Sequence, residues 1–174
     1  MAITLTGYKR QCGRQTGGVS RIGVAQASDI KGVTTSEGAI TGIEFKGDVR
    51  FVDIESAVDQ AEYTYANGET SLLIRLNRVG KESSRLNNEL ADLAPCGLVA
   101  LAQLNNGETV LIGYSEEFKL TRPIIAFDSN ATSGKALTDE NFFDITLKTT
   151  QVLAPLFLSE SVEIDTLFAA AAAE

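Results

Sequence analysis

The chain of 174 residues contains no histidine and no tryptophan. Histidine is the base of Ser-His-Asp triads and Cys-His dyads and a common zinc ligand, so its absence excludes those catalytic arrangements and every His-ligated zinc site. Two adjacent carboxylate pairs remain, Glu116-Glu117 and Asp139-Glu140. Because neighbouring residues of a strand point to opposite faces, we interpret both pairs as solvated charged segments. We expect no enzymatic activity, no cofactor and no resident metal.

Cysteine and long apolar runs are also scarce. Cys12 and Cys96 are too few for a disulfide scaffold and lack metal-knuckle spacing, so two reduced thiols are expected, with a single bridge left open. No window approaches the about 20 apolar residues that cross a bilayer, so we expect no membrane association. The N-terminus shows no secretory signal, which predicts folding in a cytoplasm. Hydrophobic residues make up 44% of the chain, which is ordinary for one globular domain spanning residues 1–174.

Charge is unevenly spread along the chain. Residues 1–35 carry five basic side chains and one acidic one, a balance of +4 that leaves −12 for the rest of a chain whose total is −8. Proteins grip a phosphate backbone through Lys and Arg that displace counterions. An acidic body without a basic groove therefore disfavours specific nucleic-acid binding.

Three local signals agree between residues 81 and 114. Ser83 or Ser84 can cap a helix whose apolar stripe then ends at Pro95 and Gly97. Residues 98–104 form a nearly unbroken apolar run, which predicts a strand covered on both faces, and residues 105–108 provide a tight hairpin turn. The stripe consists of Leu86, Leu90, Leu93 and Ala94.

The remaining patterns predict strands, and the fold class is mainly β. Alternation favours strands at 19–27, 39–45, 72–76 and 143–148, and we predict further strands at 118–127, 151–158 and 162–168. Residues 46–67 read as a long hairpin and 128–141 as a long polar loop. The expected architecture is an antiparallel β-sandwich or barrel with one flanking α-helix, an N-terminal loop or arm at 1–18 and a frayed tail at 169–174.

Two motifs carry weak chemical signals. The glycines between Gly13 and Gly18 resemble a phosphate-binding loop, but the required Lys-Ser/Thr and the receiving helix are missing. Asp128, Asn130 and Thr132 alternate like the start of a calcium loop, with Asp139 in the closing place, but Ser133 stands where glycine is needed. Tyr63 and Tyr65 share one face of a strand and are interpreted as packing residues.

Several segments occur in a characteristic order and spacing over nearly the whole chain. They are Cys12-Gly13 and Gly17-Gly18 ahead of residues 19–27 and Ser28-Asp29-Ile30, the helix at 84–94, Asn105-Asn106-Gly107 with Ile112-Gly113, Ser133-Gly134-Lys135-Ala136 with Asp139, and residues 151–158. Taken together, these segments resemble small virion proteins of tailed bacteriophages, the proteins that form tail tubes and the rings joining tail to head.

The resemblance implies a structural virion protein, assembled in the host cytoplasm as hexameric rings that stack into a tail tube through which DNA passes. Its partners would be copies of itself and other tail or neck proteins. Tail tube, connector ring and capsid decoration are not separated at this level. Segments 46–67 and 128–141 would reach neighbouring subunits. The candidate subunit-contact residues are Lys9, Arg10, Arg14, Arg21, Phe51, Tyr63, Tyr65, Asp128, Asn130, Lys135 and Asp139.

An alternative from another class is a sandwich-fold adhesion or ligand-binding module that holds calcium through residues 128–139. The absence of a secretion signal counts against it.

Overall fold

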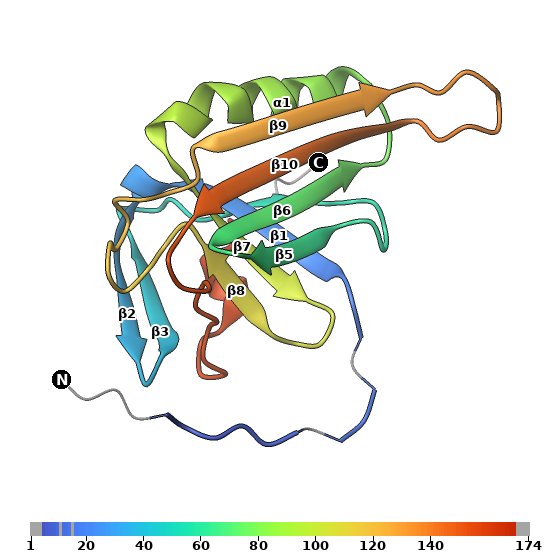
Figure 1. The fold of residues 1–174 in the computed structure, drawn as a ribbon. Coiled ribbons are helices and arrows are strands. Elements are labelled where there is room, and N and C mark those ends of the chain that lie inside the picture. Colours follow the sequence, from blue (N-terminus) through green and yellow to red (C-terminus); the bar gives the residue numbers. More distant parts are fainter. Residues whose placement is uncertain (1–4, 11, 15, 170–174) are drawn as a thin grey trace.

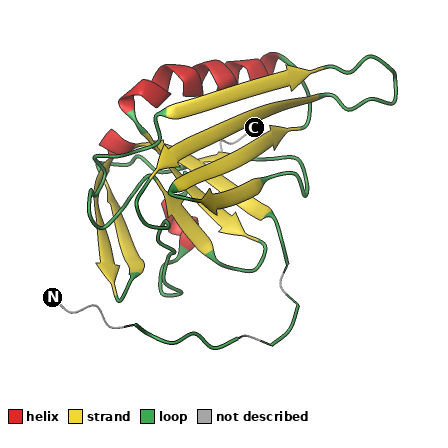
Figure 2. Ribbon diagram, in the orientation of Figure 1, coloured by secondary structure: helices red, strands yellow, loops and turns green. Residues whose placement is uncertain are grey.

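The computed structural model describes residues 5–10, 12–14 and 16–169, which form a mainly β, antiparallel fold with one α-helix among them (Figures 1 and 2). The predicted fold class is therefore confirmed. Two four-stranded sheets face each other. We call the sheet with the order β4–β1–β7–β8 the covered sheet, because a core packs on each of its faces, and the sheet with the order β5–β6–β10–β9 the open sheet, because a core packs on one face only. The covered sheet consists of β1 (Val19–Gln26), β4 (Val52–Ile54), β7 (Leu98–Leu104) and β8 (Thr109–Ile112), and the open sheet of β5 (Glu62–Ala66), β6 (Glu69–Leu76), β9 (Ala126–Thr132) and β10 (Phe142–Thr150).

Smaller elements complete the fold. A separate hairpin is made by β2 (Ile30–Ser36) and β3 (Ala39–Phe45), and the helix is α1 (Lys81–Leu93). Short 3-10 helices occupy Ala27–Asp29, Ala94–Cys96 and Ile164–Leu167. No helix among the described residues is both long and apolar enough to cross a membrane.

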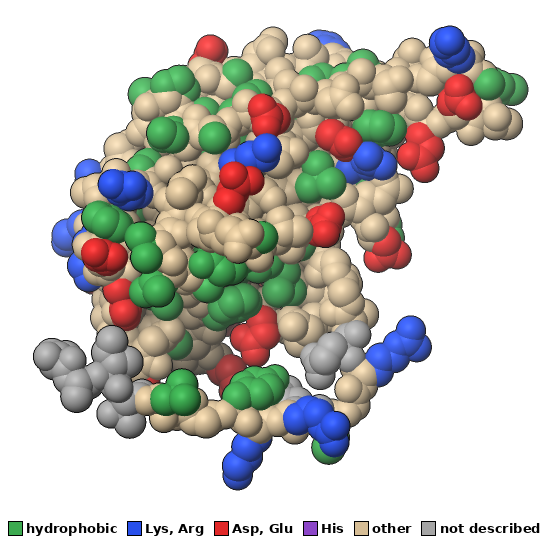
Figure 3. Space-filling view, viewed as in Figure 1, with side chains coloured by type: hydrophobic (Ala, Val, Ile, Leu, Met, Phe, Trp, Pro, Cys, Tyr) green, Lys and Arg blue, Asp and Glu red, His purple; other side chains and the backbone are tan. Residues whose placement is uncertain are grey.

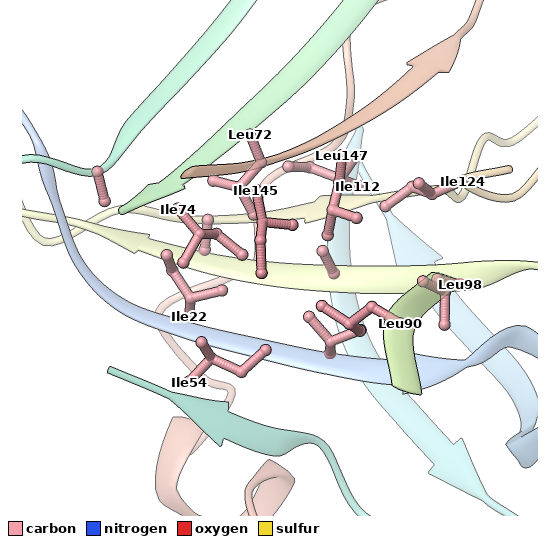
Figure 4. Close-up of a cluster of buried hydrophobic side chains, with 14 of the residues drawn as sticks. Ile22, Ile54, Leu72, Ile74, Leu90, Leu98, Ile112, Ile124, Ile145 and Leu147 are labelled. Atoms are coloured by element: carbon pink, nitrogen blue, oxygen red, sulfur yellow. The ribbon is translucent and has the colours of Figure 1, made fainter. Parts of the chain in front are cut away.

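The main core lies between the two sheets. Leu72 and Ile74 of β6 and Ile145 of β10 are wholly buried and face Ile22 and Ile112 of the covered sheet (Figure 4). Full burial of one such side chain contributes about 1.5–3 kcal/mol to folding. The open sheet therefore packs on the covered sheet through its inward face, and its other face takes no part in the main core.

A second core covers the opposite face of the covered sheet. Val99, Leu101 and Leu111 are wholly buried there beneath Ile40 of β3 and Phe168 near the C-terminus. The apolar run from Leu98 to Ala102 is therefore buried on both faces, as its sequence predicted.

Helix α1 begins earlier than its capping serines suggested. Gly80 is the N-cap, and the Ser83 hydroxyl accepts the Gly80 N–H at 2.8 Å and donates to its carbonyl at 3.0 Å, so Lys81 already lies in the helix. The predicted apolar stripe packs against the main core, with Leu90 and Ala94 buried. Gly97, at φ +97°, reverses the chain into β7, as predicted.

The predicted long hairpin at 46–67 is wrong. Val52–Ile54 pairs with β1 in the covered sheet, whereas Glu62–Ala66 pairs with β6 in the open sheet. The chain crosses from one sheet to the other between these strands. Both segments alternate, but alternation fixes only which face is buried and leaves the pairing partner open.

Three other boundary predictions are also wrong. Residues 118–125 are turns and isolated bridges, residues 151–158 contribute bridges at Phe157 and Leu158, and residues 162–168 include a 3-10 helix. These apolar segments are buried against sheet edges and faces. Such burial stabilises them without requiring that they form a regular strand. The tail beyond Ala169 and residues 1–4, 11 and 15 of the predicted arm lie outside the described residues.

The polar loop predicted at 128–141 is shorter than expected. Asp128–Thr132 belongs to β9, which pairs along its length with β10, and β10 begins at Phe142. Cross-strand pairing with β10, whose inward residues Ile145 and Leu147 are buried, overrides the weak strand propensity of Asp, Ser and Asn.

Candidate interaction surfaces

The open sheet has two unpaired edges. In the described part of the chain no strand pairs with the outer side of β5 or of β9. Every residue of β5 except Tyr63 is exposed, and every residue of β9 except Phe127. Unpaired strand edges offer rows of free N–H and C=O groups, which are templates for adding another strand.

The edges of the covered sheet are different. Along β8, the Leu111 N–H donates to the Leu156 carbonyl at 3.1 Å, and the Leu158 N–H donates to the Thr109 carbonyl at 2.8 Å. The segment 156–158 thus occupies that edge. The opposite edge is β4, which is three residues long. The long free edges therefore belong to the open sheet.

The outward face of the open sheet is mostly polar, and no other element of the described residues packs over it. Cross-strand register places Leu73, Thr146 and Asp128 in one row of this face and Arg75, Asp144 and Asn130 in the next. On the side from which Figure 3 is drawn, acidic and basic side chains lie next to one another among hydrophobic and other groups. The strand residues on this face are Glu62, Thr64, Ala66, Glu69, Ser71, Leu73, Arg75, Ala126, Asp128, Asn130, Thr132, Phe142, Asp144, Thr146, Lys148 and Thr150.

Both cations of this face are paired with carboxylates. Arg75 donates to the two Asp144 oxygens at 2.7 and 2.8 Å, its guanidinium lies 3.9 Å from the Phe142 ring centroid, and the hydrogen bond to Asp144 raises its pKa. Lys148 contacts Asp128 at 3.0 Å, and this hydrogen bond raises the pKa of Lys148. Four strand carboxylates against two cations leave a surplus of two negative charges on the face.

The loop at residues 133–141, the tip loop, extends beyond the ends of β9 and β10 (Figure 1). Asp139 Oδ2 accepts the N–H groups of Ala136 and Lys135, each at 2.8 Å, and these bonds hold the pKa of Asp139 below its ordinary value. Gly134 has φ +72°, and a Cβ there would lie 2.5 Å from the Cβ of Asp139. The loop is thus closed by its own hydrogen bonds, with Leu137 fully exposed at 103%.

The predicted calcium ligands lie in two different settings. Asp128 and Asn130 are on the strand β9, and the first is paired with Lys148. Asp139 lies in the tip loop, where one carboxylate oxygen accepts two backbone N–H groups. Successive outward residues of a strand are about 6.6 Å apart, so these oxygens do not surround one point. Among the described residues no group of three or more acidic or cysteine side chains is placed to hold a metal ion.

The predicted arm is extended. Lys9, Arg10 and Arg14 are exposed, together with the apolar side chains of Leu5 and Tyr8 at 95% and 87% exposure. The arm joins the body at Gly17 and Gly18, whose carbonyls accept hydrogen bonds from the side chain and backbone of Asn105 at 2.8 and 3.0 Å. Cys12 and Cys96 are both free and exposed.

Arg21 and Phe51 make contacts within the chain. Arg21 donates to Asp165 at 2.7 Å and to Asp53 at 3.2 Å, and its guanidinium lies 3.7 Å from the Phe168 ring centroid. Phe51 is 0% exposed and packs against Phe168, so the structure contradicts its assignment as a surface contact. Its position in an alternating segment did not show that the C-terminal segment would cover it.

The two tyrosines of β5 share the inward face, as predicted. Tyr63 packs edge-on against Phe157, with ring centroids 6.5 Å apart, and burial followed by the charge of Tyr65 raises the pKa of Tyr63. Tyr65 is 38% exposed, near the free edge of the sheet. Of the two, only Tyr65 offers substantial surface to another molecule.

Sequence reasoning did not identify two features of these surfaces. Leu137 is a lone apolar residue in a polar segment, and only the projection of the loop shows that it is fully exposed. The free edge at β9 was hidden because its polar residues read as a loop. Neither the segment around Leu137 nor β9 contains a helical stripe or an apolar alternation, so the sequence carried no signal for these two features.

Comparisons with protein-family models, with curated proteins and with solved structures found no match for the chain.

Proposed function

We propose that the protein is a structural subunit that assembles with copies of itself into closed rings, which stack into a hollow tube of the bacteriophage tail-tube type. The observation that carries this proposal is the open sheet, with long free edges at β5 and β9 and a polar outward face. Pairing β9 of one copy with β5 of the next would remove both free edges at once. A heterologous contact of this kind closes into a ring when its rotation closes.

Strand direction is compatible with that ring. The open sheet has four strands, and each pairs antiparallel with its neighbour, so β5 and β9 run in opposite directions. A copy related by rotation about an axis near the strand direction keeps its strand directions. Its β5 would therefore run antiparallel to the first copy's β9, and one antiparallel ladder would continue around the ring.

The faces of the open sheet also suit a barrel wall. One face packs on the main core, and the other is polar and uncovered. In a closed ring the polar face would line the channel, and the covered sheet with α1 would form the outer layer. Barrels of about 16 strands already enclose an aqueous channel, so a ring of four or more copies, each supplying four strands, would be hollow.

The charge of the polar face supports passage of DNA without retention. Its carboxylates outnumber its cations, and both Arg75 and Lys148 are paired with carboxylates. Phosphates are held by Lys and Arg and repelled by carboxylates. A channel lined by this face would therefore let a duplex slide through, and the site of action would be the virion, beside other tail or neck proteins.

The experiment is to concentrate the purified full-length chain and measure its mass by light scattering while imaging it by negative-stain electron microscopy. The expected result is rings with a central hole, or tubes of stacked rings. A protein that remains monomeric across the accessible concentration range, with no rings in any image, would overturn the proposal. Addition of calcium serves as a control, because an adhesion module would gain thermal stability with the ion and a tube subunit would not.

A further inference from the structure

The last described residues of the chain run beside the start of β4. The Phe51 N–H donates to the Leu167 carbonyl at 2.9 Å, and the Ala169 N–H donates to the Phe51 carbonyl, also at 2.9 Å. Phe51 and Phe168 thereby form a parallel bridge. Both backbone groups of Phe51 are used by this segment and not by β1, so residues 167–169 lie on the outer edge of the covered sheet.

The backbone groups of Asp53 come next along this edge. Successive residues of a strand direct their N–H and C=O groups alternately to either side, so those of Asp53 point the same way as those of Phe51. Asp53 makes no backbone hydrogen bond to any described residue outside the covered sheet. The edge of β4 therefore offers one free donor and one free acceptor directly beyond the bridge at Phe51.

The bridge at Phe51 fixes the register of any continuation. Two residues further along a parallel ladder, residue 170 lies opposite Asp53. In that register the Asp53 N–H donates to the Ala169 carbonyl, and the Asp53 carbonyl accepts the Ala171 N–H, which repeats the two bonds made at Phe51. Both free groups of Asp53 are then satisfied.

A groove alongside β4 leaves room for another strand. One part of it, about 310 Å³ in volume, is lined by all four residues 52–55 and by α1. Because successive strand residues point to opposite faces, a hollow that touches all four lies against the edge of the strand. The other part, about 150 Å³, continues past Val52 and Leu86 and has a mostly apolar lining. Val52, which borders both parts, is 57% exposed.

The groove lining has more acidic than basic side chains, five against three, a surplus of two negative charges. Such a lining repels an acidic segment and accepts an uncharged one. Residues 169–171 are all alanine, and the acidic Glu174 follows only three positions later. The charged residues of the lining are Asp29, Asp53, Glu55, Glu82, Glu89, Arg50, Arg78 and Arg85.

The position of Ala169 favours this chain's own segment over a segment from another molecule. Ala169 is already bound at one end of the groove, so the two residues after it are delivered to Asp53 by the chain itself. A short connection of this kind gives an effective concentration on the order of millimolar. A basic segment of a second copy, such as residues 9–14, would match the charge of the lining but would have to bind from solution.

We infer that Ala170 and Ala171 dock on the outer edge of β4, with Ala170 opposite Asp53, and add a fifth, parallel strand to the covered sheet. This docking goes beyond the proposed function and does not depend on ring formation. Both edges of the covered sheet are then occupied, by residues 156–158 at β8 and by residues 169–171 at β4. Of the two four-stranded sheets, only the open sheet keeps free edges for another copy.

A disulfide tests the register. In a Cys12→Ser, Cys96→Ser background, Asp53→Cys with Ala170→Cys places two thiols opposite each other on one face, at the Cα separation of about 5 Å that a disulfide accepts. The expected result is a bond within one chain, seen as a faster-migrating monomer on a non-reducing gel. Asp53→Cys with Ala171→Cys is the matched control and should not form the bond, because a shift of one residue turns the second thiol to the other face.

Three outcomes of this cross-linking would overturn the inference. They are the absence of the bond at Ala170→Cys, equal yields from the two pairs, and bonds that join two chains, which would place a second copy's segment in the groove.

Hydrogen exchange tests the same docking without engineered thiols. The Asp53 amide should be protected in the parent chain, and Ala171→Pro, which removes one donor of the ladder, should speed its exchange about tenfold. Ala172→Pro is the control, because the N–H of residue 172 points away from β4 in this register, and it should leave the rate unchanged. An Asp53 amide that exchanges in the parent chain as fast as an unbonded amide would contradict the docking. Both tests are read on the monomer, so their result is separate from that of the ring.

Discussion

At the residue scale, the packing of the second core depends on the absence of a side chain at Gly23. A Cβ at this position would lie 2.6 Å from Cε1 of Phe168 and 2.9 Å from Cβ of Phe51. The two rings can approach β1 only because glycine leaves that space. Arg21 then covers the Phe168 ring and joins the C-terminal segment to β1 through Asp165.

Gly23→Ala should therefore destabilise the fold by about 1–3 kcal/mol, the usual cost of inserting a methyl group into a packed core. Gly32→Ala is the matched control, because Gly32 also lies in a strand and a Cβ there meets nothing within 4 Å. Denaturant unfolding of both variants measures the difference. Equal midpoints for the two would show that Phe168 does not pack on β1 as described.

Asp139 provides a pH-dependent signal in the tip loop. The N–H groups of Ala136 and Lys135 favour its charged form and lower its pKa from an ordinary value of 3.8. The stabilisation of the loop is thus fully present above the ordinary value and is lost as pH falls through the lowered pKa. On acidification, the amide resonances of Lys135 and Ala136 should shift together with a midpoint below 3.8.

Asp139→Asn is the control for that titration, because it removes the ionisable group and should abolish the transition at both amides. A midpoint at or above the ordinary value would show that the carboxylate does not accept these hydrogen bonds.

At the element scale, the sequence predicted the elements with strong local patterns and missed those defined by pairing. The stripe of α1, the apolar run of β7 and the turn before β8 were predicted because each pattern is specific to its structure. Strand β9 was missed because its polar residues become a strand only beside β10. Strands β4 and β5 were assigned to one hairpin because alternation contains no information on partners.

The same reasoning explains why the candidate surface was only partly predicted. Lys135 and Asp139 were placed in a contact segment and do lie in the projecting loop. Phe51 was misassigned because its burial requires Leu167 and Phe168, far along the chain, in addition to the nearby ring of Phe45.

Proline at two adjacent positions of β9 tests whether its free edge is used. Successive residues of an edge strand direct their N–H groups alternately toward the partner and away from it. Of Ser129→Pro and Asn130→Pro, one should therefore cost a bond to β10 and lower stability, and the other should spare the monomer and block rings. Thermal unfolding combined with negative-stain imaging distinguishes the two. Normal rings from both variants would show that β9 is not an interface.

At the scale of the whole molecule, the two sheets have different roles. The covered sheet is buried on both faces, and segment 156–158 occupies the edge at β8, so it makes a self-contained support. The open sheet is buried on one face and free at both edges, which suits it to join other copies. A long free edge is an aggregation hazard in a monomer, and closure into a ring removes the hazard.

The central claim is that β5 of one copy pairs with β9 of the next, and hydrogen exchange on isolated monomers and assembled rings measures this directly. The amides of β5 that point away from β6, and those of β9 that point away from β10, should exchange quickly in the monomer and become protected together in the ring. The amides of β7, which is already paired on both sides, should change little. Rings that form while the amides of β5 and β9 continue to exchange at the monomer rate would contradict the account.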